Sequence, residues 1–192
     1  MNKREQQRLE RREQIINCSL DMIISRGYES MKIRDLAEQL NISTGLFFNY
    51  FESKEQIYEE LVKIAISGTQ HVLTFNPEGI RPIELFEKIT QAIFESLKSN
   101  SRTAKMFILM AQACESKAVP ESVKELVSRF DAVTPMVPIV KMGQQLGEIK
   151  EGDPAALLVA YWGSIQGIAE SYAIKPNLPL PQSSWIVDIL RK

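Results

Sequence analysis

Residues 33–54 constrain the fold of this 192-residue chain more than any other stretch. Apolar residues recur there at the i, i+3, i+4, i+7 spacing of one helix face, in the order Ile33, Leu36, Ala37 and Leu40. Asn41 follows, and asparagine tolerates the left-handed backbone conformation that many helix C-termini require. Ser43 is a strong N-cap for a second helix, so residues 41–43 leave room only for a sharp turn.

The second helix is predicted to have two different faces. Phe47 and Phe51, at i and i+4, anchor it inward, while Ile42 fills the corner between the helices. The opposite face carries Thr44, Gly45, Phe48 and Asn49. In a helix-turn-helix, a steep crossing turns the leading residues of the second helix outward, toward the major groove of DNA. The same spacing also fits an ordinary helical hairpin, and periodicity alone does not separate the two.

A resemblance favours the DNA-binding alternative. The pair Gly27-Tyr28, the run STGLFFNYF from Ser43, and the tripeptide Ser53-Lys54-Glu55 resemble the DNA-binding domain of the TetR (tetracycline-repressor-like) family of transcriptional regulators. The match runs without a gap over about residues 12–57. It implies an all-α protein with an N-terminal three-helix helix-turn-helix domain, residues 1–54, and a larger helical ligand-binding and dimerisation domain, residues 55–192.

Roles on DNA can be assigned from side-chain chemistry. Thr44, Gly45 and Leu46 lie in the first turn of the second helix, where short side chains let the backbone approach base edges. Arg34 can reach a guanine or a phosphate, and Tyr50 and Lys54 are expected at phosphates. By resemblance these positions match family residues that touch DNA. The full predicted DNA-binding set is Arg34, Ser43, Thr44, Gly45, Leu46, Phe48, Asn49, Tyr50 and Lys54.

Two departures from the family pattern bear on this prediction. The family usually has tyrosine where this chain has Phe48, so a hydroxyl bond to phosphate is lost, although Phe48 can still pack on sugars or a thymine methyl. The family threonine that opens the preceding helix is replaced by Met31, so this N-cap is shifted or lost, at a cost of about 1 kcal/mol. Ordinary roles stay open too, with Arg34 a solvated charge and Leu46 and Tyr50 partly core.

Charge gives mixed support for nucleic acid as the partner. The formal net charge is -1, so the chain has no globally basic surface. The first twelve residues are richer in basic side chains, with Lys3, Arg4, Arg8, Arg11 and Arg12 against Glu5 and Glu10. Such a segment can lie along phosphates or in a minor groove. It can equally be a solvated helix start that aids solubility.

The rest of the chain is predicted to form helices separated by breakers. We expect helices over residues 7–26, 53–73, 82–99, 103–114, 139–146, 154–174 and 183–190, with another opened by Pro120. Gly27, a loop over residues 75–81 and a Pro-rich linker over residues 176–181 interrupt the helical pattern. Asp153 followed by Pro154 is typical of an N-cap and a first helical residue.

The larger domain carries predicted dimer and ligand residues. The glycines at 163 and 167 form a small-xxx-small pair on an apolar helix, and little chain remains to cover the apolar stripe of the last helix. A four-helix bundle between two copies, as in the family, is predicted through Gly163, Gly167, Trp185, Ile186 and Ile189. The resemblance alone implies a cavity for a small apolar or amphipathic effector, lined by Phe86, Ile89, Phe107, Met110, Phe130, Met142, Trp162 and Gln166. An aromatic interior of this kind is often simply core.

Catalytic, metal and cofactor sites find no support in the sequence. Cys18 and Cys114 match no CxxC or Cys/His spacing, and the only histidine, His71, has no ligand partner at suitable spacing. The chain has no nucleophile motif and no glycine-rich phosphate loop. The N-terminus lacks the apolar core of a signal peptide, and the most apolar run, residues 155–169, is too short to span a bilayer. We expect a soluble, cytoplasmic protein that is not an enzyme and needs no metal or cofactor.

Together these features predict a ligand-responsive, homodimeric DNA-binding regulator. Its partners would be double-stranded DNA at a palindromic operator and a second copy of itself, and repression is the family's usual output. One alternative is a regulator of the same fold that answers to a protein partner or to no ligand. The other is a helical small-molecule-binding or enzymatic protein whose helix-turn-helix is vestigial.

Overall fold

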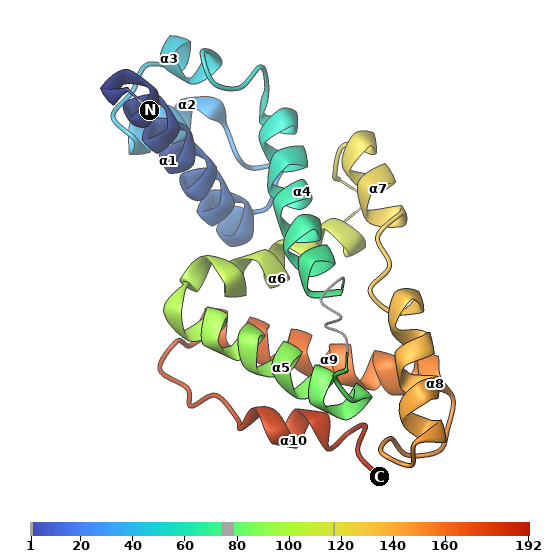
Figure 1. Cartoon of the computed structure of the whole chain (residues 1–192). Helices are drawn as coiled ribbons and strands as arrows, with labels where there is room; N and C mark the ends of the chain where they lie inside the picture. The colour runs from blue at the N-terminus through green and yellow to red at the C-terminus, as the bar shows by residue number, and fades with distance from the viewer. Residues whose placement is uncertain (1, 74–78, 117) are drawn as a thin grey trace. The chain divides into compact units, whose positions relative to one another are not determined.

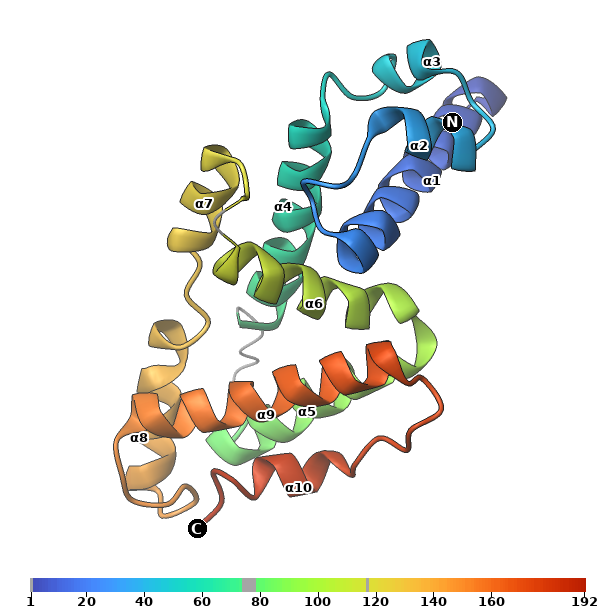
Figure 2. The ribbon, with the colours of Figure 1, turned by 180° about the vertical axis from the view of Figure 1, so that it is seen from behind.

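The computed structural model of this chain describes residues 2–73, 79–116 and 118–192, with the backbone alone for residues 71–73. In that part the regular elements are helices, apart from one isolated antiparallel bridge between Ile149 and Arg191, so the predicted all-α class is confirmed (Figures 1 and 2). The fold separates into two compact units: unit 1 is Met1–Ala65 with Ile108–Arg129, and unit 2 is Ile66–Phe107 with Phe130–Lys192. The functional division after residue 54 stays a prediction.

Unit 1 contains α1 (Lys3–Arg26), α2 (Ile33–Gln39), α3 (Thr44–Phe48), the first part of α4 (Lys54–Leu73), the end of α6 (Ser101–Glu115) and α7 (Glu121–Ser128). α1 begins earlier than the predicted residue 7, because Asn2 and Glu5 form a capping box. Its C-terminal half is the predicted core face, with Ile15, Cys18, Ser19, Met22 and Ile23 buried. Gly27 ends the helix at a φ of 79°, a value that favours glycine.

The start of α2 confirms that a cap has been lost. Lys32 occupies the N-cap position and makes no side-chain hydrogen bond to the helix end. Met31, which stands where the family has threonine, is buried in the core of unit 1. The chain therefore lacks the capping hydroxyl but buries an apolar side chain at this position, and the burial stabilises the fold through the hydrophobic effect.

Unit 2 is built on α5 (Pro82–Ser99), α9 (Pro154–Ile174) and α10 (Ser183–Val187), which pack on one another, with η1 (Thr134–Met136) and α8 (Val137–Gln145) beside them. Pro82 and Pro154 open their helices as predicted, and the Asp153 carboxylate accepts the Ala156 N–H at 2.8 Å. The predicted inward stripe of α5 is buried: Ile83, Phe86, Ile89, Ile93 and Leu97. Most of the loop expected at 75–81 falls on residues 74–78, which lie outside the described residues.

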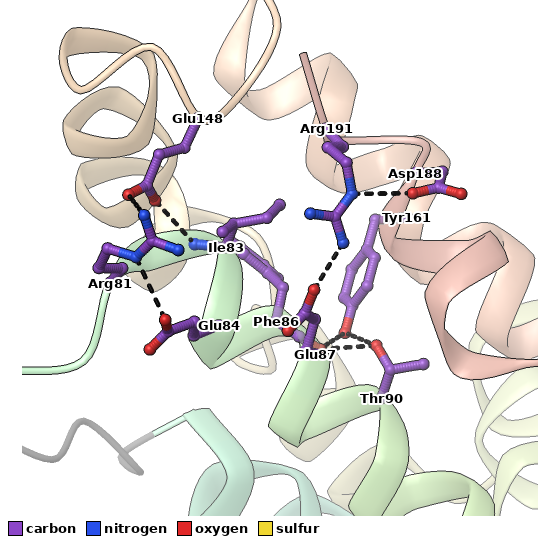
Figure 3. Close-up of polar contacts among 10 residues, drawn as sticks. All are labelled: Arg81, Ile83, Glu84, Phe86, Glu87, Thr90, Glu148, Tyr161, Asp188 and Arg191. Carbon is purple, nitrogen blue, oxygen red and sulfur yellow. Dashed lines mark hydrogen bonds and ion pairs between the residues drawn. The ribbon is translucent and has the colours of Figure 1, made fainter.

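Long-range polar contacts hold the ends of these helices (Figure 3). Glu148 accepts the Ile83 N–H at 3.3 Å, so it caps α5 from a position 65 residues further along the chain. Arg81 joins this carboxylate at 3.5 Å. Deeper in the core, the Tyr161 hydroxyl lies 2.8 Å from Thr90 Oγ1, and burial raises the pKa of this tyrosine. Thr90 Oγ1 also donates to the Phe86 carbonyl at 2.8 Å, so both buried hydroxyls have hydrogen-bond partners.

α10 is shorter than the predicted helix over residues 183–190. It ends at Val187, after which the chain turns back toward the segment that precedes α9. The Lys150 N–H donates to the Leu190 carbonyl at 2.9 Å, and the Lys192 N–H donates to the Glu148 carbonyl at 3.1 Å. These bonds use backbone groups that a further helical turn would need, and tertiary pairing overrides local helix propensity here.

Candidate nucleic-acid interface

The turn between α2 and α3 has the predicted construction. Asn41 adopts a left-handed φ of 52°, and the Ile42 N–H donates to the Ala37 carbonyl at 2.9 Å. Ser43 is the N-cap of α3, and its Oγ accepts the Leu46 N–H at 3.1 Å. Local hydrogen bonds therefore fix the turn between these two short helices.

α3 also has the two faces that its sequence predicts. Phe47 and Phe51 are buried, with ring centroids 6.0 Å apart, and they hold the helix to the rest of unit 1. Phe48 stands edge-on to Phe47 but remains 52% exposed. The other outward residues, Thr44, Gly45 and Asn49, are exposed as well. The predicted outward edge is thus free of the chain's own core, and α3 forms the tip of unit 1 in Figure 1.

The remaining predicted DNA-contact residues lie around this edge and differ in how exposed they are. Arg34 on α2 has a side chain 82% exposed, and its Nε lies 3.8 Å from Asp35 Oδ1. Leu46 and Tyr50 are half-buried. The Ser43 hydroxyl accepts from the helix backbone and keeps its own proton for another acceptor.

Lys54 is engaged inside the protein. Its Nζ lies 3.4 Å from the carbonyl oxygens of Tyr28 and Glu29 and 3.5 Å from that of Met31, and it sits 4.3 Å from the centre of the Tyr28 ring. An ammonium group has three donors, and these carbonyls match that number. Lys54 therefore fastens the start of α4 to the segment between α1 and α2, and a phosphate contact would compete with these bonds.

Further contacts of the same unit escaped the sequence-based prediction. Tyr28 stacks on Tyr58 at 4.9 Å, and its hydroxyl donates to Glu55 Oε1 at 2.6 Å. Burial and this hydrogen bond raise the pKa of Tyr28, and the same bond lowers the pKa of Glu55. Arg12 pairs with Glu60, 48 residues away, and lies over the Phe51 ring. Contacts at such separations leave no periodic signal in the sequence. Tyr28 itself was singled out only as part of the Gly27-Tyr28 pair that carries the family resemblance.

A polar groove runs along the N-terminal half of α1. Tyr50, just after α3, forms one side of it, and α1 supplies Arg4, Gln7, Arg8, Glu10, Arg11 and Gln14. Figures 1 and 2 both show the N-terminal end of α1 beside α3. Arginines thus lie next to the outward edge of α3, where a duplex entering along that edge would bring phosphates.

The family model described as "Bacterial regulatory proteins, tetR family" matches residues 15–61. This segment contains the buried half of α1, the turn, α3 and the start of α4. The chain belongs to the TetR family of transcriptional regulators. It is therefore a DNA-binding transcriptional regulator with the helix-turn-helix in unit 1.

Relatives of this TetR-family regulator extend the likeness beyond the matched segment. The transcriptional repressor DhaR of Mycobacterium sp. (strain GP1) is 24% identical over 185 residues, covering 92% of this chain and 89% of DhaR. The repressor KstR2 of Mycolicibacterium smegmatis is 25% identical, over 58% of this chain and 54% of KstR2. The crystal structure of the MbdR regulator from Azoarcus sp. CIB, 15% identical, covers 94% of this chain and 96% of its own with a TM-score of 0.76, which shows a shared fold. These relatives are regulators.

The predicted effector residues of the regulator are mostly interior. Phe86 and Ile89 are buried in the core of unit 2, and Phe107, Phe130, Trp162 and Gln166 are half-buried there, whereas Met142 is 44% exposed. Met110 belongs to unit 1. Gln166 donates to the Phe107 carbonyl at 3.0 Å and pairs with Glu170. Trp162 Nε1 is buried and has no acceptor among the described residues.

The predicted dimer residues divide into exposed and buried ones. Gly163 and Gly167 are exposed on α9, and a Cβ added at either would meet nothing within 4 Å. Trp185 is 59% exposed. Ile189 is half-buried, but Ile186 is buried in its own core, so little of that side chain is left for a partner. The apolar stripe of α10 is mostly covered by α5 and α9 of the same chain.

Two observations concern membrane spans and metal ligands. No helix in the described part is both long and apolar enough to cross a membrane. Among the described residues, no three histidine, cysteine or acidic side chains gather as metal ligands would. The side chain of His71 lies outside the described residues, and Cys18 and Cys114 are free thiols, the first buried and the second exposed.

Proposed function

We propose that this regulator is a homodimeric repressor whose two α3 helices enter successive major grooves of a palindromic operator. The observation that carries the proposal is the two-sided α3, in which Phe47 is held in the core while Thr44, Gly45 and Asn49 face solvent. A two-fold pair of such helices fits half-sites about 34 Å apart, one turn of the duplex. DhaR and KstR2 are named repressors, which supports repression as the output.

Each predicted DNA residue is given a role that its position allows. Thr44 and Gly45 meet base edges at the start of α3, and Asn49 hydrogen-bonds to a base edge at the other end of the helix. Phe48 packs on sugars or on a thymine methyl, since it lacks a hydroxyl. Exposed Arg34 reaches a guanine or a phosphate. The other predicted members bind or position the backbone: Ser43, Leu46, Tyr50 and Lys54.

Dimerisation is proposed through the outer face of α9. Gly163 and Gly167 leave that face without side chains, while Val159 is 60% exposed and Trp185 of α10 is 59% exposed. α9 carries a single charged residue, Glu170, over 21 residues. Such a surface gains free energy when it leaves water, and the missing Cβ atoms let a second helix approach closely. Two copies of α9 and α10 would form a four-helix bundle.

An effector is proposed to act on unit 2. The half-buried Trp162 offers an indole N–H with no acceptor among the described residues, and it packs against the same core cluster as Phe107. A small apolar or amphipathic molecule with one hydrogen-bond acceptor fits this chemistry. Its binding would weaken the DNA-bound state through a coupling of about 1 to 3 kcal/mol. Like its DNA, the regulator would be cytoplasmic.

The proposal is tested by selection from DNA. Full-length protein is mixed with fragmented genomic DNA of its source organism, and the retained duplexes are sequenced and measured by mobility shift. We expect palindromic sites, bound by a dimer, with affinity that falls as salt rises. Thr44→Ala and Asn49→Ala should each weaken binding by about 1 to 3 kcal/mol and relax the preference at one position of the half-site.

Asn177→Ala is the matched control, since Asn177 is exposed in unit 2 and is given no role on DNA. It should bind as the unmodified protein does. If no duplex is retained even at low salt, the regulator function is refuted, and the helical ligand-binding or enzymatic alternative takes its place.

A further inference from the structure

The helix face that carries the groove of α1 continues the face that builds the core of unit 1. At about 100° per residue, positions 4, 8 and 11 all lie within about 40° of position 15 around the helix axis. Residue 15 is the buried Ile15, and the same face continues through the buried Cys18 and Met22. Going toward the N-terminus, this face therefore changes from apolar to arginine where α1 leaves the core.

The arginines on this face form no ion pair with the carboxylates that the structure describes. Arg4, Arg8 and Arg11 line the groove, and no carboxylate of the described residues forms an ion pair with any of them. Glu10, also at the groove, accepts a hydrogen bond from Gln6 Nε2 at 3.2 Å. The next arginine differs, because Arg12 is paired with Glu60 and lies over the Phe51 ring. Three arginines outnumber the single carboxylate of Glu10 at the groove, so the cations repel one another and an anionic ligand would reduce that repulsion.

We propose that Arg4, Arg8 and Arg11 bind the sugar–phosphate backbone of the operator, outside the major-groove segment that α3 reads. The inference rests on the proposed function, since it names a second contact between the same regulator and the same DNA. The family model matches residues 15–61, so these arginines lie before the segment that the model describes.

Geometry selects an extended polyanion over a single phosphate group. Residues 4 to 11 span about 10 Å along α1, and one strand of a duplex carries about one phosphate per 3.4 Å of axis, so about three phosphates match three arginines. Tyr50 forms the opposite side of the groove and follows the outward edge of α3 by one residue after Asn49. A duplex seated on α3 therefore passes the groove, where Gln7 and Gln14 add neutral donors.

The test compares salt dependence in full-length variants on the duplexes selected above. Affinity is measured by fluorescence anisotropy at several salt concentrations for the unmodified protein and for Arg4→Gln/Arg8→Gln/Arg11→Gln. The slope of log affinity against log salt should become shallower by about 2.7 for each protomer, which is about 0.9 for each phosphate that is no longer neutralised. Affinity at about 0.1 M salt should fall at least tenfold, with the preference for selected over scrambled duplexes unchanged.

Two controls separate charge at this face from total charge and from folding. Arg4→Lys/Arg8→Lys/Arg11→Lys keeps the cations and should keep most of the slope. Arg129→Gln/Lys141→Gln/Lys175→Gln removes the same charge from exposed positions elsewhere and should leave the slope nearly unchanged. Glu10→Gln should strengthen binding, because it removes a carboxylate from the groove. Circular dichroism confirms the helical content of each variant.

The outcomes are distinguishable. If the unmodified protein selects no duplex, both the regulator function and this contact are overturned. If it binds its duplexes and the Gln variant shows the same slope and affinity, the arginine contact alone is overturned. The arginine contact is also overturned if the Gln and Lys variants lose affinity equally with the slope unchanged, since position rather than phosphate binding would then explain the loss.

Discussion

Two exposed helix faces of this regulator differ in the way they meet water. The outward face of α3 with the adjacent groove of α1 is polar, small or cationic, with Thr44, Asn49 and Arg8 among its residues. The outer face of α9 is uncharged over most of its length, with Val159 and Ile174 60% and 72% exposed. Exposed arginine and threonine side chains are well hydrated, and phosphates and bases can take the place of that water. An exposed valine instead gains free energy in any contact that removes it from water.

The pattern of burial on α9 strengthens the contrast. Its opposite face, with Leu158, Tyr161, Ile165 and Ala169, is fully buried in unit 2, so the helix is apolar on both sides. α1 is instead apolar on one face of its C-terminal half and polar elsewhere. A helix that is apolar all round belongs in an interior. We therefore expect the face of α3 and α1 to bind a polyanion and the outer face of α9 to bind a second apolar surface.

The largest effect is expected from Gly167→Glu. The carboxylate would be placed at the proposed α9 contact, and two-fold symmetry would bury two such charges close together, each at a cost of several kcal/mol. The dimer should dissociate at micromolar concentration, as measured by sedimentation equilibrium, while the monomer keeps its helical content. Ala92→Glu adds the same charge at an exposed position of α5 and should leave the dimer intact.

Gly163→Ala and Gly167→Ala sharpen that experiment. In the single chain both positions have open space, so alanine should raise helix stability by up to about 1 kcal/mol each. If a partner helix packs against them, the added methyl groups should weaken the dimer despite the gain in the monomer. A dimer strengthened by both changes would remove α9 from the interface.

Phe47 and Phe48 are adjacent aromatic residues of α3, one buried and one half exposed, so their variants can be compared directly. Phe47→Ala removes a fully buried ring and should lower the free energy of unfolding by about 3 to 5 kcal/mol. Phe48→Ala should lower the free energy of unfolding by less than about 1 kcal/mol, since the side chain is half exposed. The folded Phe48→Ala protein should nevertheless bind DNA more weakly. Urea denaturation and mobility shift measure the two quantities separately. Equal destabilisation by both would mean that α3 is not two-sided.

Ser43→Ala probes the corner on which the outward edge depends. It removes the acceptor of the Leu46 N–H and should cost about 1 kcal/mol of stability, with Ser43→Gly costing less. DNA affinity should fall for the alanine variant and recover partly with Ser43→Asp, which can cap the helix again. An alanine variant with unchanged affinity would show that the cap is dispensable for α3.

Local signals predicted much of this fold. Asn41, Ser43, Pro82 and the Asp153-Pro154 pair act through their own backbone or the next turn, so their effects are visible in a short window of sequence. The burial of Phe47 and the exposure of Thr44 followed from helix periodicity in the same way. Their roles on DNA stay predictions.

What the sequence did not predict depends on distant partners. α10 stops at Val187 because residues after it bond to the segment around Lys150, and Ile186 is covered by helices that its own stripe could not specify. The phosphate contact of Lys54 stays a prediction, and no local signal indicated that its ammonium also meets carbonyls of the segment before α2. Helix periodicity predicts which way a side chain points, but it does not identify the group that the side chain contacts.

The smallest effect concerns Tyr28, which supports the helix-turn-helix from behind. Its hydroxyl donates to Glu55 and lowers the pKa of that carboxyl, so ionised Glu55 stabilises the folded state. This contribution is complete above the ordinary glutamate pKa of about 4.3 and is lost as pH falls through the lower folded value. Tyr28→Phe should therefore lower stability by about 1 kcal/mol or less near pH 7, and by progressively less below pH 4. Urea denaturation of both proteins over this range measures the difference; a constant gap down to pH 2 would mean that Tyr28 acts through its stacking on Tyr58 instead.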